Sequence, residues 1–137
     1  MKVLFDTNIV LDFLFDRKPF SEFAAHLFTE VEKGTLQGYL CATTITTLYY
    51  LSAKTKGKDL AEQHIRSLMS LFEIAPVHRA VLESALQARF DDFEDAVICE
   101  AAVHVGAQAI VTRNLSDFKK SKIPLYSPEQ LTKIIKC

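Results

Sequence analysis

The stretch KVLFDTNIVLD, residues 2–12, opens with a short apolar run and turns polar at Asp6. Such a run is typical of a buried strand, and the residues after the break are typical of the start of a helix. The segment QAIVT at residues 108–112 has the same form and is followed by a polar run that begins at Arg113. We therefore expect two buried strands with polar residues directly after their carboxyl ends.

The rest of the chain alternates between helical spacing and short apolar runs. Ser21 is expected to cap the first of the later helices, and the helix at residues 91–104 is expected to bury a stripe that includes Phe93 and Val97. The predicted helices cover residues 22–33, 59–71, 78–88, 91–104 and 128–135, with one more opening at Thr43 or Thr44, and further strands are predicted at 36–42, 72–76 and 124–126. This alternation is typical of an α/β sandwich around a parallel sheet.

Composition limits the class of protein. The 137 residues are 49% hydrophobic and 24% charged, which fits one folded domain over residues 1–137 and excludes disorder. The net charge of −1 leaves room for a local basic patch but for no global basic field. Apolar runs are too short to cross a bilayer, so no membrane association is expected. Cys41, Cys99 and Cys137 show no metal-binding spacing, and we expect free thiols in a cytoplasmic protein.

Polar residues after the two buried strands indicate a shared site. Ligands of open parallel sheets bind just beyond the carboxyl ends of the strands. If the two strands are neighbours, Asp6 and Asp117 share one crevice with Thr112 and Asn114. The helix at 91–104 begins at the same edge.

Three more acids, Asp92, Glu94 and Asp95, lie in the first turn of that helix. Like charges held close together repel, so one carboxylate becomes protonated or the site takes a cation. Oxygen ligands of this kind suit Mg²⁺ or Mn²⁺. Taken singly, Asp92 also fits a helix cap paired with Asp95, and Asp6 fits a turn.

Four passages together resemble the PIN domain, the metal-dependent nuclease fold of VapC-type toxins. They are KVLFDTNIVLD (2–12), ATTITTLYYL (42–51), DFEDAVICEAA (92–102) and AIVTRNLSDF (109–118). The resemblance implies a three-layer α/β/α sandwich with a central, mainly parallel sheet, a Mg²⁺ or Mn²⁺ site, and a ribonuclease that hydrolyses RNA phosphodiester bonds. It also suggests a toxin with a cognate antitoxin protein, and a homodimer.

Carried over to this sequence, the resemblance identifies Asp6, Asp95 and Asp117 as catalytic acids, with Thr112 and Asn114 as polar companions that orient the carboxylates or the attacking water. In this hypothesis these three acids, together with Glu94 or Asp92, bind one or two ions. The basic residues Arg113, Lys119, Lys120 and Lys122 are candidates for RNA backbone contacts, with a solvated loop as the alternative.

One position departs from the family. The second family acid is normally a Glu early in the helix after the second strand, and here that position falls at Thr47, within a segment that holds no acid. Either Glu94 or Asp92 supplies the missing charge, or catalysis is weakened and the chain is an RNA- or protein-binding module. A small-molecule phosphatase is a third class, but its Asp-x-Asp motif is absent because Asn8 follows Asp6 by two positions.

Overall fold

A five-stranded sheet forms the centre of the computed structural model, which describes residues 1–136. All four neighbouring strand pairs are parallel, and the strand order is β3-β2-β1-β4-β5. The strands are β1 (Lys2–Phe5), β2 (Gln37–Cys41), β3 (Glu73–Ala75), β4 (Ala109–Val111) and β5 (Leu125–Tyr126). The predicted parallel sheet is confirmed.

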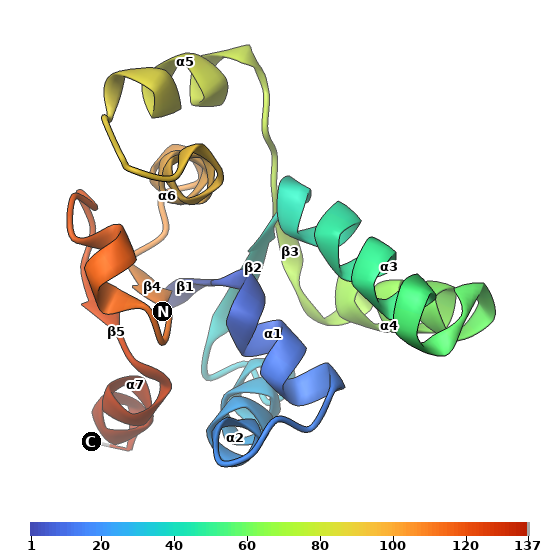
Figure 1. Ribbon diagram of the computed structural model, residues 1–137. Coiled ribbons are helices and arrows are strands. Elements are labelled where there is room, and N and C mark those ends of the chain that lie inside the picture. Colours follow the sequence, from blue (N-terminus) through green and yellow to red (C-terminus); the bar gives the residue numbers. More distant parts are fainter. Residues whose placement is uncertain (137) are drawn as a thin grey trace.

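Helices cover both faces of this sheet (Figure 1). They are α1 (Thr7–Leu14), α2 (Phe20–Glu32), α3 (Ala42–Lys56), α4 (Lys58–Leu71), α5 (Arg79–Gln87), α6 (Phe93–His104) and α7 (Pro128–Ile135), and a short 3₁₀ helix spans Leu115–Phe118. Helices α5 and α6 lie on one face, whereas α1, α2 and α7 lie on the other. The chain therefore has the expected three-layer α/β/α architecture.

The alternation of side chains along β1 explains the two halves of the core. Val3 and Phe5 pack with α1, α2 and α7, whereas Leu4 packs with α5 and α6. The same division holds in β4, where Val111 faces the first layer and Ile110 the second. Successive strand residues point to opposite faces, so an apolar run buried on both sides is what a central parallel strand needs.

Two local expectations are wrong. Ser21 does not cap α2, because the helix begins one residue earlier at Phe20 with Pro19 at the cap position, and Ser21 is buried inside the helix. Phe93 is 48% exposed instead of buried, because it lies in the first turn of α6, before the buried part of the helix. That part contains every residue from Ala96 to Ala102 and lies between the sheet and α5. A central helix enclosed in this way has no single apolar stripe.

Cys41 and Cys99 are buried free thiols, as expected, and Cys137 lies outside the described residues. No helix within residues 1–136 is long and apolar enough to span a membrane.

The strand order fixes where a site can form. The chain moves from β1 to β2 and β3 on one side, and β4 and β5 lie on the other side of β1. The order therefore reverses between β1 and β4, and such a reversal leaves a crevice beyond the carboxyl ends of the two strands.

Candidate active site at the carboxyl edge of the sheet

Asp6 lies at the carboxyl end of β1, and only 3% of its surface is exposed. The pairing of Phe5 with Val111 brings Thr112 beside it. The Thr112 hydroxyl donates a hydrogen bond of 2.9 Å to Asp6 Oδ2 and accepts one of 3.0 Å from the Asn114 amide. The sheet register therefore joins Asp6, Thr112 and Asn114, as the sequence predicted.

A second group of acids lines a pocket of about 230 Å³ beside the start of α6. Asp92 and Asp95 come from that helix start, and Asp117 comes from the 3₁₀ helix after β4. Asp92 also caps α6, because its carboxylate accepts a 3.0 Å hydrogen bond from the Asp95 amide. The cap interpretation of Asp92 is thus confirmed, and the cap residue faces the pocket as well.

The acids of the two groups influence one another. Burial, followed by repulsion from Asp92, Asp6, Asp117 and Glu94, raises the pKa of Asp95 to about 7. Burial also raises the pKa of Asp6, against the lowering effect of its hydrogen bonds from Thr112 and the Thr7 amide. Burial is the largest cause of both shifts, and repulsion between the acids adds to it.

The donor chemistry fits a hard divalent cation. The pocket offers carboxylate oxygens, and a cation would relieve the repulsion that raises the Asp95 pKa. Within residues 1–136, no three His, Cys, Asp or Glu side chains are already gathered closely enough to form a metal-binding group. The acids therefore share an electrostatic field but not a closed coordination sphere.

The remaining sequence-predicted polar residues are less central. Glu94 is exposed and does not line the pocket, although its charge contributes to the raised pKa of Asp95. The Asn114 carbonyl accepts the Asp117 amide at 3.0 Å, so Asn114 shapes the turn that carries Asp117.

Helix α3 confirms that the segment of the second family acid lacks a charge. Its first turn contains no acid, and Thr47 is half-buried. One turn earlier, the buried Thr44 shares a 2.8 Å hydrogen bond with Thr7 at the start of α1. The start of α3 therefore carries hydroxyl groups where a carboxylate was expected from the family pattern.

The four basic candidates have different surroundings. Lys119 and Lys120 line the acidic pocket, and Lys120 also donates to the Arg89 carbonyl. Lys122 lies 3.5 Å from the buried Glu100. Arg113 lies on the other face of the sheet edge, in a two-point contact with Asp12 (Nε–Oδ2 2.7 Å and Nη2–Oδ1 3.0 Å).

Sequence reasoning missed the role of Asp12. This residue is 1% exposed in α1 and pairs with Arg113, while Arg17 lies 3.8 Å away. A single acid within the apolar run IVLDFL was the available signal, because a charge that is buried needs a partner. The pair joins α1 to the loop that carries Asn114 and Asp117.

Comparison with known proteins agrees with this geometry. The sequence model of the PIN domain matches residues 2–116. Ribonuclease VapC1 from Aquifex aeolicus (strain VF5) is 24% identical over 133 residues, which cover 93% of this chain and 86% of the relative.

Solved structures share the fold. FitAcB from Neisseria gonorrhoeae superposes with a TM-score of 0.75 at 22% identity, covering 93% of this chain and 98% of that one. A toxin-antitoxin complex from Klebsiella pneumoniae superposes with a TM-score of 0.69 at 25% identity, covering 92% and 97%. With the family match spanning most of the sequence, and with strand order and acidic site in agreement, the chain belongs to the PIN domain family.

Proposed function

We propose that this chain is a metal-dependent endoribonuclease and the toxin of a toxin–antitoxin pair. The observation that carries the proposal is the grouping of acids from three segments around Asp95, whose pKa is raised to about 7 first by burial and then by repulsion from Asp92, Asp6, Asp117 and Glu94. Similarity to Ribonuclease VapC1 supports RNA as the substrate. Similarity to a toxin-antitoxin complex supports an antitoxin protein as partner.

The proposed cofactor is Mg²⁺ or Mn²⁺, in keeping with the divalent-metal dependence general among VapC-type nucleases. Asp6, Asp95 and Asp117 would hold it, with Asp92 or Glu94 as an additional ligand. A divalent ion bound there would supply positive charge for the phosphate and would lower the pKa of a water molecule, so that the water loses a proton more readily as it attacks phosphorus. Because the carboxylates do not form a closed group, binding requires their side chains to draw together.

The residues of the chain would prepare this chemistry. Thr112 fixes one oxygen of Asp6 by its 2.9 Å hydrogen bond, so the carboxylate enters the site in a defined orientation. Asn114 holds the turn that presents Asp117. Lys119 and Lys120 line the same pocket and would contact RNA phosphates, since ammonium groups bind the backbone without regard to sequence.

Three further expectations belong to this proposal. A single domain extends over residues 1–137, and the protein acts in the cytoplasm, which the buried free thiols of Cys41 and Cys99 support. The chain forms a homodimer, which light scattering after gel filtration tests.

A second candidate function rests on the missing acid. With Thr47 on α3 in place of a Glu, the site would hold a metal ion and RNA without cutting. Such a binding module differs from the nuclease in one measurable property, the release of RNA products.

Cleavage assays separate the two. Purified protein is incubated with a fluorescently labelled single-stranded RNA in Mn²⁺, in Mg²⁺ and in EDTA, beside an Asp95→Asn variant from the same preparation. The nuclease predicts products with either ion for the parent, none in EDTA, and none for the variant. RNA that is bound but left intact in both ions supports the binding module. Equal cleavage by parent and variant contradicts the assignment of Asp95.

A further inference from the structure

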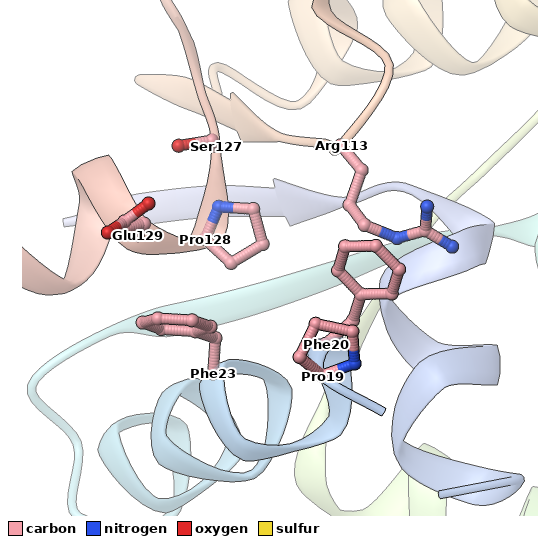
Figure 2. Close-up of a pocket in the computed structure, with 7 residues that line it drawn as sticks. All are labelled: Pro19, Phe20, Phe23, Arg113, Ser127, Pro128 and Glu129. Atoms are coloured by element: carbon pink, nitrogen blue, oxygen red, sulfur yellow. The ribbon is translucent and has the colours of Figure 1, made fainter. Parts of the chain in front are cut away.

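A second pocket lies at the same edge of the sheet, on the α2 and α7 side (Figure 2). Its volume is about 420 Å³, within the range of pockets that hold small organic groups. Aromatic and proline rings form much of its lining, namely Phe20 and Phe23 of α2 with Pro19, and Pro128 at the start of α7, where the carboxylate of Glu129 also lines it. Arg113 closes one end.

The register of the sheet places this pocket next to the candidate active site. Phe5 pairs with Val111, and Val111 pairs with Tyr126. The next residue on each strand is therefore at the same height along the carboxyl edge of the sheet. These residues are Asp6, Thr112 and Ser127. Hydrogen bonds from the Asp6 amide to Val111 (3.0 Å) and from the Thr112 amide to Tyr126 (2.9 Å) show that the ladder continues to this point.

The pocket and the acids are thus close but face opposite ways. Ser127 lines the pocket, and it is two strands from Asp6, roughly 10 Å at the usual spacing of neighbouring strands. The side chain of Asp6 points to the α6 side, with Thr112, while that of Arg113 points to the α2 side, with Asp12 and Phe20. A chain that lies across the carboxyl edge can reach both.

The chemistry of the pocket suits a flat, uncharged ring. The Arg113 guanidinium is paired with Asp12 and lies 4.0 Å from the centre of the Phe20 ring, so its charge is balanced and its position is fixed. The Phe23 ring is 38% exposed and faces the pocket opposite Pro128. Rings at these positions offer stacking surfaces, and they offer little attraction to a phosphate.

We infer that this pocket binds an unpaired base of the RNA whose backbone lies at the acidic site. The inference rests on the proposed function and adds to it a recognition element that the acids do not provide. Bases stack on aromatic side chains in single-strand binding proteins, whereas phosphates require charge. One nucleotide near the cleaved bond would place its phosphate on the α6 side of the edge and its neighbour's base between Phe23 and Pro128.

The test combines a change in the protein with a change in the RNA. A single-stranded RNA that the parent cleaves is prepared with a phosphorothioate at the cleaved bond and with one abasic residue at each position in turn. Affinities are measured in Mg²⁺, which coordinates the sulfur poorly, by fluorescence anisotropy for the parent, Phe23→Ala, Phe23→Leu and the control Phe13→Ala. Phe13 is a comparably exposed phenylalanine, 41% against 38%, on α1 outside this pocket.

We expect one abasic position to weaken binding to the parent by at least about fivefold, the lower end of what a stacked base contributes. Removal of the base at the same position should not weaken RNA binding by Phe23→Ala. It should weaken binding only slightly in Phe23→Leu, which keeps the side-chain bulk without the ring. Phe13→Ala should retain the parent's profile. A cooperative thermal transition above the assay temperature shows that each variant is folded.

The proposal and the proposed function fail in different ways. A parent that cleaves RNA but shows no abasic position that depends on Phe23 overturns the base pocket alone. Binding of N-acetyl-tryptophan amide that Phe23→Ala weakens, with the RNA profile unchanged, assigns the pocket to a peptide side chain and also overturns it. A parent that neither binds nor cleaves RNA overturns both.

Discussion

At the scale of single residues, the site is a set of acids whose charges are incompletely balanced. Asp6 has hydrogen bonds from Thr112 and from a backbone amide, yet its pKa is still raised by burial. Asp95 is more strongly affected, with a pKa of about 7. The free energy of folding therefore contains a penalty at neutral pH that depends on these two side chains.

Asp95→Asn should raise the melting temperature of the metal-free protein. The folded pKa of Asp95, about 7, lies above the usual value of 3.8, so the folded state binds the extra proton between these pH values. The penalty is absent below about pH 4, grows as pH rises toward 7, and stays constant above. Thermal unfolding in EDTA should thus show a larger gain at pH 8 than at pH 4.

Glu62→Gln is the matched control, because Glu62 is an exposed acid on α4. It should change the melting temperature little at either pH. An Asp95→Asn gain that is equal at both pH values would show that charge repulsion is not its cause.

Thr112→Val should lower the free energy of unfolding by about 2 kcal/mol, the range of a hydrogen bond to a charged group. The substitution keeps the shape of the side chain but leaves the buried Asp6 oxygen and the Asn114 amide without the hydroxyl group. Urea unfolding measures the loss. Thr112→Ser, which retains the hydroxyl, should recover most of it, and an equal loss in both variants would assign the effect to packing.

At the scale of elements, the Asp12–Arg113 pair holds α1 against the loop after β4. Asp12 is 1% exposed and Arg113 is 23% exposed, so the carboxylate depends on its partner more than the guanidinium does. Removing one member of a buried pair leaves an uncompensated charge, which costs about 3–5 kcal/mol.

Arg113→Met should therefore destabilise the protein by about 3 kcal/mol, near the lower end of that range because Arg17 lies 3.8 Å from Asp12 and replaces part of the lost charge. The double variant Asp12→Leu/Arg113→Met removes both charges and should regain much of the loss. Urea unfolding is measured for the parent, both single variants and the double variant, which together form a double-mutant cycle. Additive losses would show that the two residues do not act as a pair.

The sequence predicted the elements better than their contacts. Strands β1 and β4 could be predicted because each is a short apolar run followed by polar residues, and α7 could be predicted from the proline at its start. The Asp12–Arg113 pair joins residues 101 positions apart, and no local pattern encodes it. The exposure of Phe93 and the burial of Ser21 likewise depend on which neighbouring elements cover the two helices.

The candidate site was predictable to the same extent. Asp6 and Thr112 follow two strands that proved to be neighbours, so sheet topology brings them together, and the turn at Asn114 then places Asp117 on the same edge. Glu94 does not line the acidic pocket, and Arg113 points away from the acids toward Asp12. Both facts depend on the direction of side chains at the ends of helices and strands. Periodicity in a sequence carries little information there.

At the scale of the whole molecule, the proposed ion would act as a stabilising ligand. A divalent ion that binds the folded state alone adds about 2.7 kcal/mol at one hundred times its dissociation constant. Mn²⁺ should therefore raise the melting temperature of the parent in a concentration-dependent way. Asp95→Asn should lose most of that increase, whereas Glu62→Gln should keep it. An equal increase in all three proteins would place the ion elsewhere.

If Asp6, Asp95 and Asp117 together bind a divalent ion, the position of that ion in a crystal reveals it. Crystals of the protein grown with Mn²⁺ give an anomalous scattering map that locates manganese independently of any assumption about its ligands. Ion binding by these acids predicts a peak at the carboxyl ends of β1 and β4, within coordination distance of oxygens from Asp95 and at least one of Asp6 and Asp117. A fully occupied manganese peak elsewhere on the chain, with none at this edge of the sheet, would contradict it.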